Sequence, residues 1–205
     1  KTKIKTKSRL KKIIFKNNFA KKIIINNDII KINKKDLVIL AVTPNIISRI
    51  IPKFKVPKKT NCILNIHFKL NQIHKKIKLP NNSFFVGIIG GTIDWIFKKK
   101  NILSITISAA NNLNKLNNEE ISEIVWSDVK KVFNLENITK PKYKIIREKM
   151  ATFVQSPNEI YKKPKMLTQY KNIFLAGDWI DTGLPATIEG AITSGYNIAS
   201  YINNN

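Results

Sequence analysis

Residues 172–195 contain an apolar run, a glycine, one carboxylate and a helix-like segment in close succession. Residues 173–176 have the short apolar pattern of a buried strand, which ends at Gly177, and Asp178 follows directly. From Pro185 onward the apolar residues recur at helical spacing, so the sequence predicts a helix that begins near Pro185. The free amides and the positive dipole end of such a helix attract anionic or carbonyl-rich ligands. This segment is therefore a candidate cofactor site.

Two features of this segment have both a structural and a functional explanation. Gly190 and Gly195 lie inside the predicted helix, at a cost of about 1 kcal/mol each relative to alanine, so either close packing or a ligand explains them. Asp178 can cap the turn by bonding to its own backbone, or it can bind a ligand. The residue types alone leave both choices open.

The segment resembles the C-terminal flavin motif of the FAD-dependent amine-oxidase and phytoene-desaturase superfamily. The matching residues are Ala-Gly-Asp at 176–178 and Ile-Glu-Gly-Ala at 188–191. Glu189 follows Asp178 by 11 positions, a spacing similar to that of carotenoid-type desaturases. Within the superfamily, the segment looks most like the squalene-associated branch, the hydroxysqualene dehydroxylases.

The resemblance implies FAD as the cofactor and assigns roles to individual residues. The cofactor-binding residues that it implies are Gly177, Asp178, Pro185, Ala186, Thr187 and Ile188. Asp178 would bind hydroxyl groups on the ribityl or pyrophosphate side of FAD. The amides of Thr187 and Ile188 would face N1 and the C2 carbonyl of the flavin, where they stabilise negative charge. Glu189 is better explained as support for the helix dipole than as a catalytic base.

Other segments resemble the same branch in the same order along the chain. Residues 37–44 look like the strand and proline that lead back into the flavin domain, and residues 147–153 look like the strand before the flavin motif. Residues 87–97 and 104–110 resemble paired strands of the substrate domain. The resemblance covers residues 22–201 as an ordered set.

Three further residues are candidates for a substrate pocket. The resemblance suggests Trp95 as a pocket wall near the flavin, although an ordinary half-buried strand aromatic has the same pattern. Trp179 and Asp181 lie in the turn between the predicted strand and helix, where they line a pocket or are solvated. The sequence identifies no catalytic side chain.

The superfamily also has a Gly-x-Gly-x-x-Gly turn that holds the ADP half of FAD, and this sequence has no match to it. The nearest glycine cluster, at residues 87–91, lacks the spacing. The chain begins with Lys1 rather than Met. We therefore expect a C-terminal portion of a longer flavoprotein, or one piece of a split one, which carries half a cofactor site and needs the missing N-terminal half as a partner.

The formal net charge of +24 raises anionic partners as a possibility. Lysine is spread along the whole chain together with abundant Ile and Asn, which A/T-rich codons favour, so compositional drift explains the charge without a partner. Basic residues concentrate only at residues 1–12 and 98–100, and we expect no nucleic-acid binding. Peripheral contact with an anionic membrane remains a secondary expectation, because isoprenoid substrates dissolve in lipid.

Cysteine and histidine usage limits the remaining chemistry. The single cysteine, Cys62, rules out an internal disulfide framework and fits a reducing compartment, so we expect a cytoplasmic protein, with the membrane contact as an addition. His67 and His74 would lie on opposite faces of a continuous strand, and no ligand cluster predicts a metal site. No serine nucleophile elbow is present.

The predicted fold is an α/β, Rossmann-like flavin-binding domain portion interleaved with an α+β antiparallel-sheet substrate domain. We assign residues 1–55 to the flavin domain, 56–155 to the substrate domain and 156–205 to the C-terminal flavin segment. The expected elements are a hairpin about 26–28, strand 37–42, a helix from Pro44, a meander of strands 63–69, 73–79, 84–89, 93–97 and 102–109, helix 119–133 with Asn117 or Asn118 as cap, and strand 143–153.

The resemblance implies a bacterial FAD-dependent oxidoreductase that acts on a long isoprenoid. The reaction that it favours is the reductive removal of the hydroxyl of hydroxysqualene to give squalene, in squalene and hopanoid biosynthesis. The protein would supply an apolar tunnel, orientation and charge stabilisation. A carotenoid or phytoene desaturase and an amine oxidase are alternatives within the superfamily. A basic, non-enzymatic binding fragment is an alternative outside it.

Overall fold

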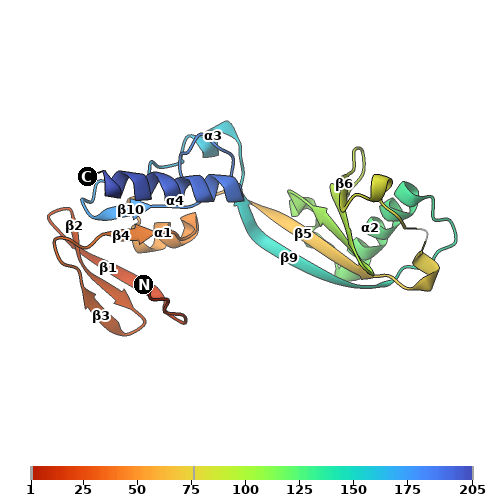
Figure 1. Cartoon of the computed structure of the whole chain (residues 1–205), viewed down its shortest axis with the longest axis horizontal. Helices are drawn as coiled ribbons and strands as arrows, with labels where there is room; N and C mark the ends of the chain where they lie inside the picture. Colours follow the sequence, from red (N-terminus) through yellow and green to blue (C-terminus); the bar gives the residue numbers. More distant parts are fainter. Residues whose placement is uncertain (1, 76, 205) are drawn as a thin grey trace. The chain divides into compact units, whose positions relative to one another are not determined.

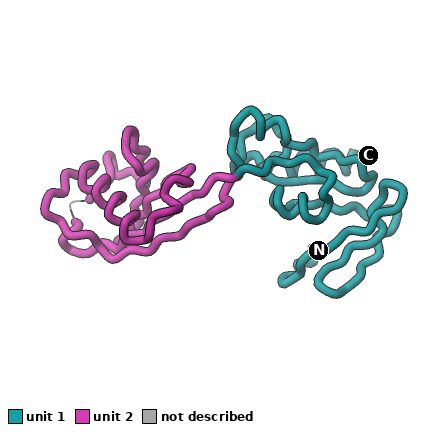
Figure 2. The backbone as a smooth tube through the Cα atoms, turned by 180° about the vertical axis from the view of Figure 1, so that it is seen from behind, with its two compact units in different colours: residues 1–59, 153–205 teal, residues 60–152 magenta. Residues whose placement is uncertain are grey.

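A computed structural model describes residues 2–75 and 77–204. The chain forms two compact units, coloured separately in Figure 2. Unit 1 comprises residues 1–59 and 153–205, and unit 2 comprises residues 60–152. The chain thus leaves unit 1 once and returns to it once. The domain bounds predicted from the sequence stay a prediction for the intact protein.

Unit 1 begins with a three-stranded antiparallel sheet, β1 (Leu10–Lys16), β2 (Phe19–Ile25) and β3 (Asp28–Lys31). Asn17 and Asn18 both have positive φ and join β1 to β2 in a two-residue turn, a conformation that asparagine tolerates well. The predicted hairpin between β2 and β3 is confirmed. β1 was not predicted, because its lysines obscure the alternation and only Ile13 is buried in it.

The core of unit 1 surrounds a parallel strand pair, β4 (Val38–Leu40) and β10 (Ile173–Leu175). All of β10 is buried, as the continuous apolar run predicted. Helices α1 (Pro44–Ile50) and α4 (Ile188–Asn203) belong to the same unit, with the short helix α3 (Pro157–Ile160) (Figure 1). The largest core cluster of unit 1 consists of Ile13, Ala20, Leu40, Ile47, Ile51, Val56, Phe153, Ile173, Leu175, Trp179, Ile180 and Ala186.

Unit 2 is a five-stranded sheet in the order β6-β7-β8-β5-β9. Its strands are β5 (Thr60–Lys69), β6 (Phe85–Gly87), β7 (Trp95–Lys99), β8 (Ile102–Ile107) and β9 (Lys142–Phe153). Three pairs of neighbouring strands are antiparallel: β6 with β7, β7 with β8, and β8 with β5. Because β5 lies between β8 and β9, the sheet is not the simple meander that the sequence predicted.

Helix α2 (Asn118–Phe133) packs against one face of this sheet (Figure 1). The side chain of Asn117 accepts a hydrogen bond from the Glu120 amide, and Glu120 bonds back to the Asn117 amide, so the predicted cap is confirmed as a capping box. The buried residues of α2 are Ile121, Ser122, Val125, Trp126 and Val129. They meet alternate residues of β5 and β8, which fixes the face of each strand.

The predicted strand 73–79 is wrong. Gln72–His74 is a short 3-10 helix, η1, and the described residues between it and β6 contain no strand. His74 is buried, its Nδ1 accepts a hydrogen bond from the Asn71 amide, and its Nε2 lies 3.0 Å from the carbonyl oxygen of Thr139. His67 and His74 therefore do not share a continuous strand. Two further 3-10 helices, η2 (Pro80–Asn82) and η3 (Ala110–Lys115), precede β6 and α2.

Candidate functional site

The buried strand β10 carries the chain into the candidate site. Its partner β4 pairs with it in parallel, and the Ala176 amide donates to the Leu40 carbonyl at 3.2 Å just beyond the last strand residue. The strand then ends at Gly177, whose φ of +137° is rare for any residue with a side chain. The start of the glycine turn is therefore fixed by the sheet.

Gly177 is also required by its neighbours. A β-carbon at this position would lie 2.7 Å from Nε1 of Trp179, inside van der Waals contact. The Gly177 amide donates to Oγ of Ser194 at 2.8 Å, and that hydroxyl donates to the Ala191 carbonyl at 2.7 Å. The strand end is thus tied to helix α4 through Ser194, and the amide of Gly177 is already paired.

Helix α4 begins at Ile188, so the predicted start near Pro185 is wrong by one turn. Thr187 is the N-cap, and its hydroxyl oxygen accepts from the Gly190 amide at 3.2 Å. Pro185 precedes the helix, and its carbonyl oxygen would lie 2.7 Å from a β-carbon at Gly190. Close packing of the 184–185 segment therefore explains Gly190. Nothing lies within 4 Å of a β-carbon at Gly195.

The first turn of α4 presents free hydrogen-bond donors. Within the described part of the chain, the amides of Ile188 and Glu189 have no acceptor, as expected for the first positions of a helix. Ile188 is 82% exposed, so these donors are not enclosed by the chain. The 16-residue helix behind them places its positive dipole end here.

Asp178 supplies an acceptor at the other end of the same turn. Its side chain is half-buried, and among residues 2–75 and 77–204 its carboxylate has no hydrogen-bond or ion-pair partner. The alternative in which Asp178 caps its own turn has no support, because no such bond forms. The carboxylate therefore remains available to a ligand with hydroxyl groups.

The three pocket candidates lie in different surroundings. Trp179 is 1% exposed and donates from Nε1 to the Val42 carbonyl at 2.9 Å, so it packs in the core of unit 1. Asp181 lines a cavity of about 280 Å³ with Ile180, Thr182 and residues of the 165–167 segment and α4. Trp95 is 42% exposed on the sheet of unit 2. Their roles toward a substrate stay a prediction, and the burial of Trp179 gives no support to its role.

Two polar residues that position the turn were not predicted. Oγ of Ser194 accepts a hydrogen bond from the Gly177 amide, and Oε1 of Gln155 accepts one from the Ala186 amide at 3.4 Å. Ser194 is 1% exposed within α4, and a buried serine on the apolar stripe of a helix is the pattern that could have indicated it. Gln155 lies in a loop, where no sequence pattern indicates its partner.

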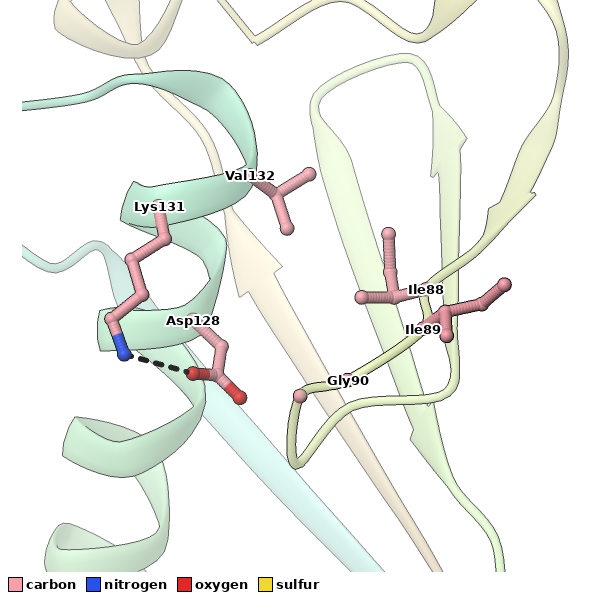
Figure 3. A pocket seen from close by; sticks show the side chains of 7 residues that line it. Ile88, Ile89, Gly90, Asp128, Lys131 and Val132 are labelled. Atoms are coloured by element: carbon pink, nitrogen blue, oxygen red, sulfur yellow. Dashed lines mark ion pairs between the residues drawn. The ribbon is translucent and has the colours of Figure 1, made fainter.

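Unit 2 has its own small cavity, of about 270 Å³, between α2 and the 88–91 segment (Figure 3). Asp128 on α2 accepts from the Thr92 amide at 2.7 Å and pairs with Lys131 at 3.6 Å. The carboxylate thus holds the glycine loop against the helix. Close packing on α2 explains Gly91, because a β-carbon there would lie 3.2 Å from Oδ2 of Asp128, whereas Gly87 belongs to strand β6.

The described residues contain neither a metal-binding cluster nor a membrane-spanning helix. No group of three or more His, Cys, Asp and Glu side chains there could hold a metal ion. No helix in that part of the chain is long and apolar enough to cross a membrane.

Comparison with known proteins identifies the family of the chain. Residues 1–203 match the family of flavin containing amine oxidoreductases. The chain belongs to this family. The match covers both units, so the amine oxidoreductase family accounts for the sheet of unit 2 as well as for β10 and α4.

Three proteins named hydroxysqualene dehydroxylase are similar to this chain. The protein of Zymomonas mobilis is 36% identical over 94% of the chain and 45% of its own length. The protein of Rhodopseudomonas palustris is 35% identical over 85% of the chain and 40% of its own length. The protein of Sinorhizobium fredii is 32% identical over 96% of the chain and 45% of its own length. The chain therefore spans less than half the length of these relatives.

Solved structures share the fold. A putative protoporphyrinogen oxidase from Exiguobacterium sp. 255-15 superposes with a TM-score of 0.64 at 15% identity, over 95% of this chain and 46% of that one. An oxidoreductase from Methanosarcina mazei superposes with a TM-score of 0.65 at 13% identity, over 94% of this chain and 49% of that one. This amine oxidoreductase family chain thus has the fold of about half of each protein.

Proposed function

We propose that this chain is the flavin-proximal part of an FAD-dependent oxidoreductase that removes the hydroxyl of hydroxysqualene to give squalene. The observation that carries the proposal is that one segment, from Gly177 to the first turn of α4, has both a hydrogen-bond acceptor and hydrogen-bond donors without partners among the described residues. Among the described residues, the Asp178 carboxylate and the amides of Ile188 and Glu189 have no hydrogen-bond partner, whereas the amides of Gly177 and Gly190 are bonded to Ser194 and Thr187. The similarity to three hydroxysqualene dehydroxylases supports the substrate.

The residues of the turn fit FAD by their chemistry. Asp178 would accept hydrogen bonds from cofactor hydroxyl groups, and the first-turn amides from Thr187 to Glu189 would donate to a carbonyl oxygen of the flavin ring. Gly177, Pro185 and Ala186 would shape the turn around the cofactor. When bound, FAD supplies the hydride chemistry that no side chain of the turn offers. The protein binds, orients and stabilises charge.

Unit 2 would be the substrate domain that the sequence predicts between two flavin-domain segments. The antiparallel sheet with one helix layer supports this, since one face of the sheet carries exposed Trp95. We keep residues 1–55, 56–155 and 156–205 as the proposed division of the intact protein. Trp95 and Asp181 remain the proposed pocket residues.

The flavin site would need a further polypeptide segment. The parallel pair β4 and β10 has three residues a strand, whereas parallel sheets occur with more strands and with both faces covered. On α4, Ile188, Ile192 and Tyr196 are exposed at positions four residues apart, which is one helix face. The part of a longer flavoprotein corresponding to the other half of the relatives would cover them and bring the ADP-binding turn.

We also propose a cytoplasmic protein with peripheral membrane contact. The net charge of +24 supports attraction to anionic lipid, and the proposed substrate dissolves in the bilayer. Flotation with anionic and neutral vesicles tests this. Binding that is equal for both vesicles, or absent, would refute the contact.

The function is tested with the protein expressed from its complete coding sequence. We expect flavin absorbance in the purified protein and conversion of hydroxysqualene to squalene with a reductant. Asp178→Asn should weaken FAD binding, whereas Asp28→Asn, on the exposed strand β3, should not. Turnover of phytoene without squalene formation would point to a desaturase, and a protein that never binds FAD would contradict the proposal.

A further inference from the structure

Unit 2 has an open cavity of about 550 Å³ whose lining is rich in lysine. Lys75, Lys98 and Lys100 line it, together with the amide side chains of Gln72 and Asn101, and we call it the lysine cavity. Its lining contains no carboxylate, and none of the three lysines forms an ion pair with a described residue. Because a cavity with charges of one sign concentrates the electric field, the lysine cavity attracts anions.

A backbone hydrogen bond holds two segments of the chain together at this cavity. Lys100 and Asn101 form the two-residue turn between β7 and β8, and the carbonyl oxygen of Asn101 accepts from the amide of Leu70 at 2.7 Å. The turn therefore lies beside the end of β5 and the segment that carries Lys75, which follows η1 directly. Both ring nitrogens of His74, which also lines the cavity, are already engaged, so the lysines are the available donors.

Lys100 occupies a backbone position that suits lysine poorly. Its φ is +54°, in the left-handed region that the first residue of a two-residue hairpin turn adopts and that asparagine and glycine favour. Asn17 and Asn26 hold the same place in the turns β1–β2 and β2–β3. Compositional drift supplies asparagine as readily as lysine, so it does not explain a lysine at this turn. A role for the ammonium group at the lysine cavity does.

We propose that the lysine cavity binds a phosphate-type anion with two or more negative charges, such as a diphosphate group. Three ammonium groups on flexible stems supply point charges for its oxygens, and the amides of Gln72 and Asn101 supply uncharged donors. The cavity volume lies within the range of about 300–1,000 Å³ of small-molecule sites. The lysine cavity belongs to unit 2 and the turn at Gly177 to unit 1, so the inference goes beyond the proposed function and does not depend on it.

Calorimetric titration with inorganic pyrophosphate tests the proposal on the protein expressed from its complete coding sequence. The protein is first saturated with FAD, so that pyrophosphate does not report on the flavin site. We expect saturable binding, which Lys98→Gln with Lys100→Gln should weaken about tenfold or more through the loss of two charged donors. Lys34→Gln with Lys35→Gln, at exposed positions of unit 1, removes the same charge and should leave binding unchanged.

Lys100→Asn separates the charge from the backbone conformation. Because asparagine suits a positive φ, the unfolding temperature should rise, while pyrophosphate binding should weaken about threefold or more. A purely structural lysine would not change the two readouts in opposite directions. Unchanged binding, or a lower unfolding temperature, would overturn the proposal.

A lipid headgroup and a soluble ligand both present phosphate oxygens, and flotation distinguishes them. Vesicles of phosphatidylcholine with and without phosphatidic acid are compared for the unchanged protein and for Lys98→Gln with Lys100→Gln. Flotation that needs both phosphatidic acid and the two lysines assigns the anion to a headgroup. Pyrophosphate binding without such flotation assigns it to a soluble ligand.

Three results would overturn the proposal, and a fourth concerns the flavin alone. No saturable pyrophosphate binding, or equal weakening by the two double variants, would mean that only general attraction to a basic chain operates. Loss of flavin absorbance in Lys98→Gln with Lys100→Gln would place these lysines at the FAD site instead. A protein that binds no FAD, yet binds pyrophosphate through Lys98 and Lys100, would count against the proposed function and support the lysine cavity.

Discussion

The hydroxyl of Ser194, in the middle of α4, accepts the amide hydrogen of Gly177 at 2.8 Å. Strand β10 and helix α4 are therefore joined by a side chain as well as by the turn between them. Gly177 adopts a positive φ and its amide donates to Ser194, so both its backbone conformation and this hydrogen bond define the start of the turn. Among residues 2–75 and 77–204, the carboxylate of the neighbouring Asp178 has no hydrogen-bond or ion-pair partner.

Replacing Ser194 with alanine should destabilise the chain by about 1–3 kcal/mol, the cost of leaving the partly buried Gly177 amide without an acceptor. The free energy of unfolding from urea titration measures this. Ser200→Ala, at an exposed position of the same helix, should change it by less than about 0.5 kcal/mol. Equal effects of the two substitutions would show that the Gly177 bond contributes nothing.

The two glycines of α4 should respond to alanine in opposite directions. At Gly190 a β-carbon meets the Pro185 carbonyl at 2.7 Å, so Gly190→Ala should be destabilising. At Gly195 there is open space in a helix interior, so Gly195→Ala should stabilise this chain by about 0.5–1 kcal/mol. Thermal unfolding of the two variants checks the signs. In the complete protein, a gain at Gly195 that turns into a loss would indicate a segment packed on this face.

Local patterns predicted the elements whose signals are complete within a few residues. The capping box at Asn117, the asparagine-rich hairpin turn and the buried run of β10 are such cases. The start of α4 was wrong because Pro185 suits a first helical position, yet Thr187 satisfies the helix amide through its side chain. The N-cap hydrogen bond of Thr187, rather than the preference of proline for the first helical position, therefore sets where α4 begins.

Contacts between distant segments explain the other differences. The 73–79 segment alternates like a strand, but His74 is held by Asn71 and by Thr139, which lies far along the chain. Likewise, Gln155 reaches the candidate site from a loop that no periodicity marks. For the site itself, the motif predicted Asp178 as a ligand-binding residue, whereas the hydrogen bond from the Gly177 amide to Ser194 was not predicted. Hydrogen-bond partners that lie far apart in the sequence come together only in the folded chain, so the spacing of residues does not predict them.

Asn172 should be a strong determinant of unit 1 stability. It is 1% exposed, and its amide group pairs with both the N–H and the C=O of Ala20, at 2.8 and 3.1 Å. Asn172→Ala leaves two buried backbone groups unpaired, so we expect a loss of about 2 kcal/mol or more. Asn203→Ala, at the exposed end of α4, is the control. Urea titration that gives similar values for both would contradict this role.

Glu159 should make stability depend on acid pH. Its carboxylate is buried and accepts from Nζ of Lys162 and from the amides of Lys58 and Lys59. The hydrogen bond from Lys162, followed by that from the Lys58 amide, lowers the pKa of Glu159 from 4.5 to about 2. Because the folded state holds the proton less tightly than the unfolded state, this contribution is complete above about 4.5 and is lost as the pH falls toward 2.

The measurement is the difference in unfolding midpoint between the unchanged chain and Glu159→Gln across that range. Glutamine keeps the shape but neither carries the charge nor titrates, so the difference should be largest near neutral pH and should shrink below pH 4.5. Glu148→Gln, an exposed carboxylate on β9, should show no comparable trend. A constant difference at every pH would mean that the shape of Glu159, and not its charge, anchors the segment that leaves unit 1 at Lys59.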